Sequence, residues 1–365
     1  MIVRNEAAVI RRCLDSVLPL IDYALLVDTG SDDGTPDVVK AWLQEHALPG
    51  EVRERPWVDF AHNRTEAAAA LREVDWIDYA LTIDADEVLV FEPGFSPGEF
   101  KSALTEDVYD VTTRSGAIVY QRPQLFSNRL AFRYRSVLHE YLEAPGKITR
   151  AAANGFHDVP SRDGARSRNP QKYARDAALL REALESETDP FLRSRYRFYL
   201  AQSLRDAGQY EEALVQYLAR AELGFWVEEV FMSLYQAGRM SERLKRPFAE
   251  TLEMYQRAHD TLPTRAEALQ AAARICRKAG RYELAYYFAR KCLEIAPPST
   301  ALFLDVSTYE YGVLRELQIA AYRTGRFAES VEAGEKLVLE AKFPERYRER
   351  IGSLIERARL KSAAG

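Results

Sequence analysis

The chain has 365 residues, of which 47% are hydrophobic and 29% charged, so it is not a disordered or low-complexity polypeptide. Its length predicts about two domains, and its formal net charge of −5 excludes the bulk basic field of many nucleic-acid-binding proteins. Three cysteines are too few for a disulfide framework, and no apolar run approaches the ~18 residues of a membrane span, which together favour a cytoplasmic protein.

The first 160 residues alternate short apolar runs with amphipathic segments. The apolar runs cover residues 1–3, 23–27, 79–83 and 117–120, and the amphipathic segments cover residues 7–18, 35–45 and 61–73. Strands that alternate with helices predict an α/β domain with a mostly parallel sheet. The runs are continuously apolar, which is typical of strands covered on both faces. We therefore expect an α/β domain over residues 1–160.

Residues 161–170 are polar with a proline at the end, which predicts a linker. Beyond them, residues 171–365 have a helical pattern and repeat one frame, a glycine followed by an aromatic and a small residue, at Gly208, Gly280 and Gly325, with a degenerate copy near Gly238. Glycine allows the turn between two antiparallel helices, and the small residue allows close packing. The frame resembles the tetratricopeptide repeat, although its spacing is irregular. A generic helical bundle is the alternative.

Polar residues follow three of the apolar runs in the first domain. They are Arg4-Asn5-Glu6, Asp28 with the turn TGSDDG, and Asp84-Ala85-Asp86-Glu87. Open α/β sheets bind ligands at the carboxyl ends of their strands. Carboxylates in an Asp-x-Asp pattern suit Mg²⁺ or Mn²⁺, which can neutralise a diphosphate leaving group. Each motif alone also fits a turn or a helix cap, but the three together in this order predict a ligand site.

The segments IVRNEAAVIRRCLDSVLPLIDYALLVDTGSDDGT, WVDFAHNRTEAAAA and DYALTIDADE resemble an inverting glycosyltransferase of family 2 with a GT-A fold, related to the Rossmann type. Within that family, the chain is similar to lipopolysaccharide-core β-glucosyltransferases and to repeat-bearing enzymes that glycosylate bacteriocin peptides. The resemblance covers about the first 160 residues. It implies a bacterial enzyme with a nucleotide-sugar donor, most often a UDP-sugar, and a divalent metal bound through the Asp-x-Asp (DXD) motif.

The resemblance implies roles for five residues around the donor. Asn5 and Glu6 match positions that line the nucleotide pocket, and Asp28 matches the aspartate that recognises uracil or ribose. Arg64 matches a basic position near the donor, and Asp84 lies by the ribose and the metal. The chain starts almost within the first strand, so we expect that strand to be short.

The resemblance also implies the metal and acceptor residues. Asp86 would bind the metal directly, and His157 would complete the metal's ligand shell. The pair His139-Glu140 resembles a pair on the acceptor side, where Glu140 would act as the general base that an inverting displacement requires. Asp158 is the next candidate for the base. For each residue, a structural role is the alternative.

Two other classes of protein compete with a metal-dependent glycosyltransferase. One is a non-catalytic repeat scaffold with a degenerate sugar-nucleotide domain, and the other is a nucleotidyltransferase, whose Gly-rich loop is missing after the first strand. Helical repeats make concave surfaces that suit polypeptides, so we favour a peptide or protein acceptor, with a saccharide, a lipid-linked glycan or a nucleobase as alternatives. The repeats could equally support a homodimer. The residues do not predict which sugar is transferred.

Overall fold

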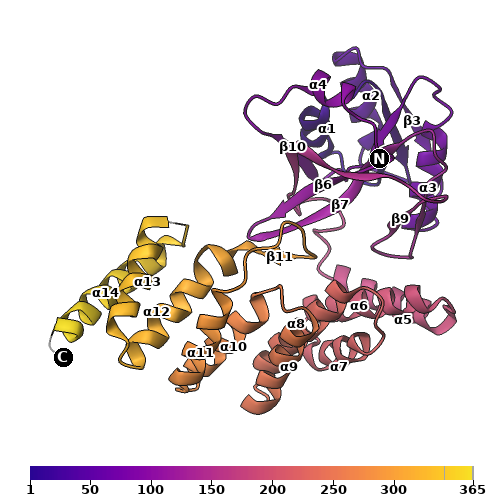
Figure 1. Cartoon of the computed structure of the whole chain (residues 1–365). Coiled ribbons are helices and arrows are strands. Elements are labelled where there is room, and N and C mark those ends of the chain that lie inside the picture. The colour runs from indigo at the N-terminus through magenta and orange to yellow at the C-terminus, as the bar shows by residue number, and fades with distance from the viewer. Residues whose placement is uncertain (341, 364–365) are drawn as a thin grey trace. The chain divides into compact units, whose positions relative to one another are not determined.

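The computed structural model describes residues 1–340 and 342–363. The chain folds into two compact units, Met1–Thr188 and Asp189–Gly365 (Figure 1). The predicted class, an α/β domain followed by all-α repeats, is confirmed. The boundary lies after residue 188, so the predicted linker 161–170 and the helix α5 (Lys172–Ser186) belong to the first unit.

The first unit begins with a small parallel sheet in the order β1-β2-β3. Its strands are β1 (Ile2–Val3), β2 (Ala24–Asp28) and β3 (Gly50–Glu54), connected by helices α1 (Ile10–Val17) and α2 (Thr35–Glu45). All five residues of β2 are buried, which explains why this strand is continuously apolar up to its terminal aspartate. The parallel connections bring the carboxyl ends of β1 and β2 to one edge.

A second sheet in this unit is mixed. Its strands run in the order β7-β6-β10-β5, and β4 pairs with β7. The bounds are β4 (Tyr79–Leu81), β5 (Glu87–Phe91), β6 (Val108–Ser115), β7 (Ile118–Ser127) and β10 (Arg150–Pro160). The β6–β7 pair is an antiparallel hairpin, and Gly116 in its turn has a φ of 61°, a conformation that favours glycine. This hairpin and the antiparallel β5–β10 pair account for the mixed directions.

The remaining elements of the first unit surround these sheets. They are helices α3 (Phe60–Leu71) and α4 (Pro97–Ser102) and a ribbon made of β8 (Arg133–Arg135) and β9 (Tyr141–Glu143). Asp59 caps α3 by accepting a hydrogen bond from the backbone N–H of His62, and this cap fixes where the helix starts. The position of Arg64 on the first turns of α3 follows from that start.

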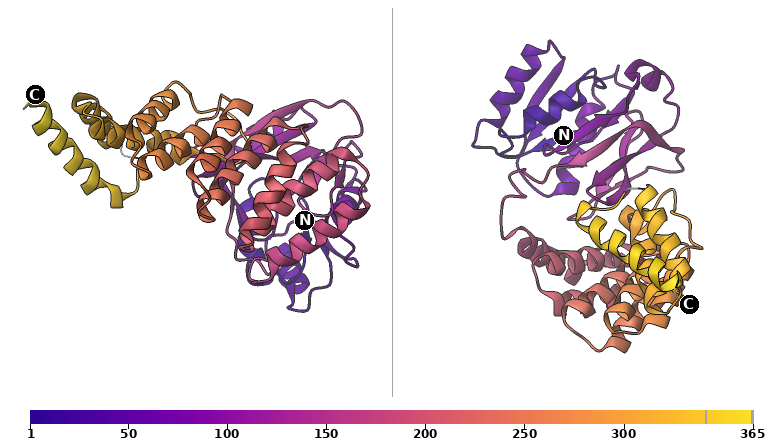
Figure 2. Two further views of the ribbon diagram at one scale, coloured as in Figure 1. Left: turned by 90° about the horizontal axis from the view of Figure 1, so that it is seen from below. Right: turned by 90° about the vertical axis from the view of Figure 1, so that its left-hand side faces the viewer.

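The second unit consists of successive antiparallel helix pairs (Figure 2). Its helices are α6 (Pro190–Asp206), α7 (Tyr210–Ala221), α8 (Val227–Arg243), α9 (Phe248–Thr261), α10 (Glu267–Lys278), α11 (Tyr282–Cys292), α12 (Val313–Arg323), α13 (Phe327–Glu340) and α14 (Arg348–Ala363). Shorter elements are β11 (Leu304–Asp305), the π-helix η1 (Thr308–Gly312) and the 3₁₀-helix η2 (Glu345–Tyr347).

The repeated glycines lie between the helices of a pair. Gly208, Gly280 and Gly325 have φ values of 80°, 72° and 78°, so the predicted turns are confirmed. Gly238 is different because it lies inside α8, where an added Cβ would come within 2.5 Å of the Tyr255 ring. The predicted degenerate copy at Gly238 is therefore wrong, and this glycine instead permits the close packing of α8 on α9. Within the described residues, no helix is both long and apolar enough to cross a membrane.

The amino group of Met1 is buried in the first unit. It donates a hydrogen bond to the carbonyl oxygen of Leu25 at 3.0 Å. Burial, with a smaller effect from the charge of Arg64, lowers the pKa of this amino group from 8.0 to about 6. Between pH 6 and 8 the unfolded chain consequently binds more protons at this group than the folded chain, so burial of Met1 opposes folding at acidic pH.

We therefore expect the Met1 amino group, taken by itself, to contribute a rise in the free energy of unfolding as the pH increases from 6 to 8. The rise due to Met1 is at most ~2.7 kcal/mol, because one pKa unit corresponds to ~1.36 kcal/mol. Urea unfolding of the chain with a free amino group, and of the same chain with an acetylated amino group, measures this contribution. An identical pH dependence in both forms would show that the Met1 amino group does not cause it.

Candidate active site

Hydrogen bonds join the loop after β1 to the loop after β2. Asn5 has a φ of 59°, a conformation that asparagine tolerates better than most residues. Its side-chain oxygen accepts from the backbone N–H of Asp32 at 2.9 Å, and its own N–H donates to the Ser31 hydroxyl at 2.8 Å. The N–H of Glu6 donates to the Thr35 hydroxyl at 2.9 Å. The two predicted nucleotide-pocket positions, Asn5 and Glu6, thus lie against the turn that follows Asp28.

Asp28 ends β2 and is only 3% exposed. Its Oδ2 accepts hydrogen bonds from the backbone N–H groups of Gly30 and Ser31 at 3.0 and 2.9 Å. Its Oδ1 is buried and has no hydrogen-bond partner among the described residues. Buried polar atoms are rarely left unpaired, so this oxygen is suited to accept a hydrogen bond from a bound ligand.

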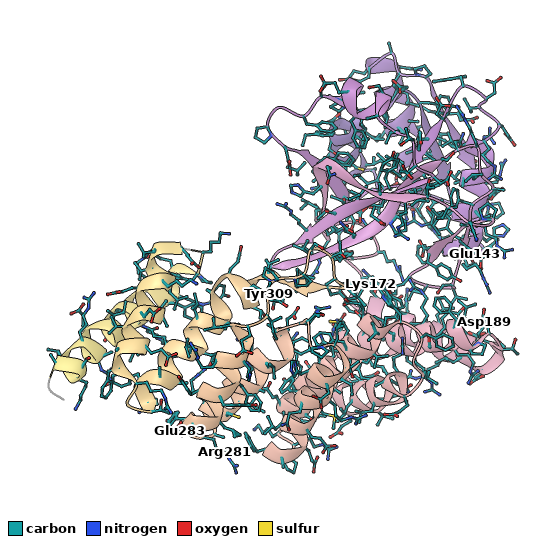
Figure 3. The ribbon with its side chains drawn as sticks, in the orientation of Figure 1. Glu143, Lys172, Asp189, Arg281, Glu283 and Tyr309 are labelled. Carbon is teal, nitrogen blue, oxygen red and sulfur yellow. The ribbon has the colours of Figure 1, made fainter. Side chains whose placement is uncertain are left out.

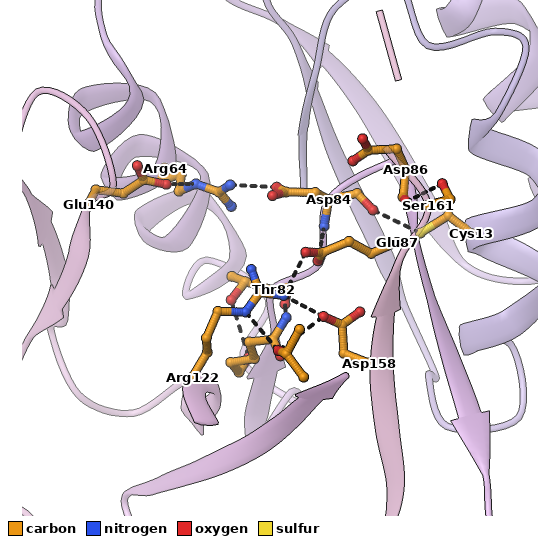
Figure 4. Close-up of polar contacts among 12 residues, drawn as sticks. Cys13, Arg64, Thr82, Asp84, Asp86, Glu87, Arg122, Glu140, Asp158 and Ser161 are labelled. Carbon is orange, nitrogen blue, oxygen red and sulfur yellow. Dashed lines mark hydrogen bonds and ion pairs between the residues drawn. The ribbon is translucent and has the colours of Figure 1, made fainter. Parts of the chain in front are cut away.

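Arg64 connects two acidic groups that are far apart in the sequence. Its guanidinium pairs with Asp84 at 2.5 Å and with Glu140, while its side chain is only 13% exposed (Figure 4). Burial alone would lower the pKa of Arg64, but the charges of Asp84 and Glu140 outweigh it and raise that pKa. Burial likewise acts to raise the pKa of Asp84, and the charges of Arg64 and Arg122 hold it below its usual value. The structure thus brings Arg64, Asp84 and Glu140 together.

His139 and Glu140 lie between the strands of the β8–β9 ribbon. His139 is exposed and has a φ of 52°, whereas the Glu140 side chain is only 12% exposed and turns toward Arg64. The ribbon is anchored to α3, because the N–H of Tyr134 donates to the Thr65 hydroxyl at 2.8 Å. The Tyr134 ring lies 5.9 Å from the Arg64 guanidinium carbon. Of the predicted pair, Glu140 is directed to Arg64, another of the candidate residues.

Asp86 is half-buried in the loop between β4 and β5. Its backbone oxygen accepts from the N–H and hydroxyl of Ser161, at 2.8 and 2.6 Å. Among the described residues, its carboxylate takes part in no hydrogen bond. A Cβ added to Gly164 would come within 2.8 Å of Asp86 Oδ2, so glycine is required for this close approach.

These residues fit a Mg²⁺ or Mn²⁺ ion that depends on its substrate for ligands. The described residues contain no group of three or more His, Cys, Asp or Glu side chains arranged to hold a metal. Mg²⁺, however, is commonly bound by one or two carboxylates, with substrate phosphates and water as the other ligands. The unpaired carboxylate of Asp86 meets that requirement, and Asp84 offers a second oxygen donor across the same loop.

His157 does not join this group, so the predicted metal ligand is not supported. It lies on β10 opposite Val90 of β5, and successive side chains of a strand point to opposite faces. Asp158 faces the buried side of the sheet, below Asp84. His157, the preceding residue, therefore faces away from Asp84. Burial, together with the charge of Arg114, lowers the pKa of His157, and neither Asp84 nor Asp86 is among its charged neighbours.

A buried network beneath the Asp-x-Asp loop was missed by the sequence reasoning. Arg122 of β7 pairs with Glu87 at 2.6 Å and with Asp158 at 2.5 Å, and it donates to the Thr113 hydroxyl at 3.1 Å (Figure 4). Glu87 in turn accepts from the backbone N–H of Asp84 at 3.1 Å. The network consequently holds the backbone of the loop that carries the Asp-x-Asp motif. No local pattern around Arg122 signals this role.

The network contains more acid than Arg122 can balance. Burial, with the charge of Asp84, raises the pKa of Glu87 to about 8. Burial also raises the pKa of Asp158, which is fully buried. Asp158 therefore cannot contact an acceptor, and its candidacy as the general base is wrong.

The segment after β10, predicted as a linker, lies over Asp86 and Glu6. Asp163 forms a two-point ion pair with Arg12 of α1, at 2.8 and 2.7 Å, and the N–H of Ala165 donates to the Glu6 carboxylate at 3.1 Å. Burial raises the pKa of Glu6, and the charge of Asp86 adds to this effect. Through Asp163 and Ala165, this segment therefore closes one side of the site rather than serving as a linker between the two units.

Cations gather at the end of this segment. Lys172, at the start of α5, is half-buried, and burial together with the charge of Arg166 lowers its pKa (Figure 3). Arg166 pairs with Asp176 at 2.5 Å, whereas Arg168 forms no ion pair with the described residues. The negative charge of Asp86 acts to raise the pKa of Lys172, and the positive charge of Arg168 acts to lower the pKa of Glu6. This excess of positive charge close to Asp86 suits an anionic ligand.

Comparison with known proteins identifies the N-terminal region. Residues 1–104 match the model of the family "Glycosyl transferase family 2". The chain is 34% identical over 148 residues to a TPR repeat-containing protein of Synechococcus elongatus, an alignment that covers 39% of this chain and 34% of that protein. It is 35% identical over 89 residues to an uncharacterized glycosyltransferase of Rickettsia felis, covering 24% of this chain and 28% of the relative. The chain thus spans about a third of the length of these relatives.

The solved structures that match this chain do so at low sequence identity and low TM-score. A tetratricopeptide repeat protein from Parabacteroides merdae aligns with 52% of this chain and 71% of its own, at 17% identity and a TM-score of 0.40. The predicted combination, a glycosyl transferase family 2 domain followed by tetratricopeptide-like repeats, is confirmed.

Proposed function

We propose that this chain is an inverting, metal-dependent glycosyltransferase. It would move a sugar from a nucleotide-sugar donor, specifically a UDP-sugar, to a peptide, protein or glycan acceptor. The observation that carries the proposal is the ion-paired series Asp84–Arg64–Glu140, because it joins the Asp-x-Asp loop of a family 2 domain to the carboxylate of the β8–β9 ribbon. Such a site needs residues that bind the nucleotide donor on one side, and a general base that takes the acceptor's proton on the other. The buried, unpaired cysteines also fit a cytoplasmic location.

The nucleoside would bind at the carboxyl ends of β1 and β2. The unpaired Oδ1 of Asp28 would accept a hydrogen bond from the uracil N–H or a ribose hydroxyl. Asn5 would hold the surrounding turn through Asp32, and Glu6 would lie at the boundary with the diphosphate.

The diphosphate would lie between Asp86 and the cations of the segment after β10. Asp86, with Asp84, would hold a Mg²⁺ or Mn²⁺ ion, which supplies positive charge to the leaving diphosphate when bound. Arg168 and Lys172 would add to that charge from this chain's own side chains. Charge placed where the opposite charge develops in the transition state commonly contributes more to catalysis than any other effect.

Glu140 would remove the proton from the acceptor. The acceptor oxygen forms a bond to the anomeric carbon as the bond from that carbon to the diphosphate oxygen breaks, and Glu140 receives the acceptor's proton. Arg64 would orient Glu140 and keep Asp84 in place through its two ion pairs. His139, which is exposed beside Glu140, would contact the acceptor.

Hydrolysis of a panel of UDP-sugars by the full chain, with and without Mn²⁺, tests this proposal. We expect release of UDP from at least some donors and a marked increase with Mn²⁺. If UDP and UDP-sugars neither bind nor turn over, the chain is instead a repeat scaffold with a degenerate sugar-nucleotide domain. Mass spectrometry of the released nucleotide would identify the donor.

Replacing Asp28 is expected to weaken donor binding more than turnover. Asp28→Ala removes both oxygens, and Asp28→Asn keeps an acceptor for the turn but presents an amide in place of the unpaired Oδ1. Loss of a hydrogen bond to a charged group costs ~1.5–3 kcal/mol, so the donor KM should rise roughly 10- to 100-fold. Asp32→Asn, on the exposed part of the same turn, is the matched control. Unchanged calorimetric affinity for UDP in Asp28→Asn would refute the role.

The repeats would hold the acceptor. A polar cavity of about 420 Å³ in the second unit is lined by aromatic and charged side chains, among them Tyr235, Arg239, Arg274, Tyr311 and Tyr347. Glu242 and Glu316, in the same cavity, are paired with Arg274 and Arg277, whereas Arg239 lies over the Tyr235 ring and forms no ion pair with the described residues. Arginine and tyrosine are the side chains that most often anchor polypeptide partners.

A fragment that contains only Met1–Thr188 tests whether the first unit binds the donor while the repeats bind the acceptor. We expect it to hydrolyse UDP-sugar as the full chain does, but to transfer sugar poorly to the acceptor found for the full chain. Light scattering of the full chain measures whether the repeats also form a homodimer. Full transfer by the fragment would exclude the repeats as the acceptor platform.

A further inference from the structure

The cavity of about 420 Å³ in the second unit extends across several helices of the stack. Its lining comes from α8, α10 and α12, together with the π-helix η1 that precedes α12. Ion pairs connect these helices along the cavity. Glu242 of α8 pairs with Arg274 of α10 at 2.5 Å, and Glu316 of α12 pairs with Arg277 of α10 at 2.5 Å. The cavity therefore spans neighbouring helix pairs, as a site for an extended ligand must.

The acidic side chains of the cavity already have partners within this chain. Among the described residues, the acids in the lining are Glu242, Asp305 and Glu316. Arg274 and Arg277 donate two hydrogen bonds each to the two glutamates, at 2.5 to 3.1 Å. Asp305 accepts from the N–H and the hydroxyl of Ser307, at 3.1 and 2.6 Å. No acid of the lining is therefore left over to balance a further cation.

Two arginines of the lining have no acidic partner. Arg239 and Arg243 are exposed and form no ion pair with the described residues. Their guanidinium carbons lie over the rings of Tyr235 and Tyr210, at 5.9 and 5.1 Å from the ring centres. The two arginines are four residues apart on α8, so they lie on one face, roughly 5–6 Å apart. Two guanidinium groups at this spacing are suited to bind carboxylates by two-point hydrogen bonds.

The aromatic rings of the cavity are less available than the arginines. The Tyr235 ring lies 6.1 Å from that of Phe231 and 6.0 Å from that of Tyr255, and Arg239 covers it as well. Arg315 lies 4.5 Å from the centre of the Tyr347 ring. Stacking of a sugar ring requires a free aromatic face, whereas a carboxylate requires only the exposed guanidinium groups. The cavity therefore suits acidic side chains better than a saccharide.

We propose that this cavity binds an acidic segment of a polypeptide, whose Asp or Glu carboxylates pair with Arg239 and Arg243. Packed helices lie ~8–10 Å apart, so three of them span ~20 Å, the length of about six extended residues. The binding of an acidic segment does not depend on the proposed function. Its identity as part of the sugar acceptor does, and it would then be a short distance along the acceptor chain from the residue that receives the sugar.

Fluorescence anisotropy of the full chain with labelled peptides tests the proposal. The probe is a peptide of about six residues in which Glu alternates with Gly, and its matched peptide has Gln in place of each Glu. We expect the Glu peptide to bind at least roughly 10-fold more tightly than the Gln peptide. The chain has a formal net charge of −5, so a general attraction of anions does not explain such a preference.

Substitution of the two arginines locates the binding. The double variant Arg239→Gln, Arg243→Gln should weaken binding of the Glu peptide by roughly 10-fold or more. Arg239→Lys with Arg243→Lys should lose less, because lysine keeps the charge but not the two-point geometry. Both residues are exposed on a helix, and glutamine and lysine are good helix formers, so these variants should fold.

A matched control removes two similar arginines outside the cavity. Arg281 and Arg323 are exposed, form no ion pair with the described residues, and lie over the rings of Phe248 and Tyr282, at 4.5 and 5.3 Å from the ring centres. The double variant Arg281→Gln, Arg323→Gln should bind the Glu peptide as the unchanged chain does. An equal loss in this control would overturn the proposal, as would a failure of the Glu peptide to bind or equal binding of the Gln peptide.

A short oligogalacturonate, an anionic chain of sugars, is the remaining probe. Tighter binding of it than of the Glu peptide would assign the cavity to an acidic glycan and overturn the polypeptide. None of these measurements requires a donor or turnover, so their failure is distinct from a failure of the glycosyltransferase assignment. The link to the acceptor is tested by competition, because the Glu peptide should inhibit sugar transfer to the acceptor found for the full chain. A Glu peptide that binds without inhibiting transfer would overturn that link.

Discussion

Asp86→Ala is expected to remove metal-stimulated turnover and to leave the fold intact. Asp86 lies in a loop beyond β4, and its carboxylate makes no hydrogen bond within the described residues, so its loss breaks no hydrogen bond of the fold. If it holds the ion that balances the leaving diphosphate, turnover at saturating Mn²⁺ should fall by a factor on the order of 10²–10³ or more. Steady-state hydrolysis as a function of Mn²⁺ concentration measures the loss of turnover, and circular dichroism of the variant measures whether the fold is intact.

A matched control separates the metal from general charge effects. Asp78→Ala removes an exposed carboxylate at the amino end of β4, where it pairs with Arg129. That variant should keep its response to Mn²⁺. Asp86→Asn should behave like Asp86→Ala, since an amide is a much weaker ligand for a hard cation. Full activity of Asp86→Ala at saturating Mn²⁺ would mean that the metal is held elsewhere.

The positions of the donor-side candidates could be predicted from the sequence because one rule of sheet topology places them. Parallel strands direct their carboxyl ends to one edge, so polar residues that follow apolar runs converge there. Asn5 and Asp28 follow this rule, since the loops after β1 and β2 are joined by hydrogen bonds. The ion pairs of Arg64 with Asp84 and Glu140 could not be derived from spacing, and only the family resemblance indicated that these residues belong to one site.

The errors have equally specific causes. His157 and Asp158 are neighbours on β10, and a strand sends neighbouring side chains to opposite faces, so only one of the two can face the Asp-x-Asp loop. Arg122 escaped notice because its partners, Glu87 and Asp158, are 35 and 36 residues away in the sequence. Residues 161–170 have the composition of a linker, yet backbone and side-chain hydrogen bonds hold them against Asp86 and Glu6. Composition does not reveal such long-range contacts.

Glu140→Gln is expected to lower kcat by ~10²–10⁴, the usual contribution of a positioned base. Glutamine keeps the size of the side chain and one acceptor oxygen, so the ribbon should stay in place and donor affinity should change little. Steady-state transfer to a hydroxyl acceptor measures the loss in kcat, and calorimetry with UDP measures donor binding. Glu143→Gln is the matched control, because Glu143 lies three residues further along the chain in β9 and pairs with Arg133 and Arg135.

The ion pair with Arg64 offers a different explanation of such a loss, in which Glu140 only positions the guanidinium. Two further measurements separate these roles. An external carboxylate such as formate should partly restore the kcat of Glu140→Ala if a proton acceptor is what was lost, whereas it should not restore the orientation of Arg64. The loss should also shrink for a thiol acceptor, which is partly ionised near neutral pH and depends less on a base. Wild-type transfer to a hydroxyl acceptor by Glu140→Gln would assign Glu140 a structural role and leave the base to be found elsewhere in the ribbon.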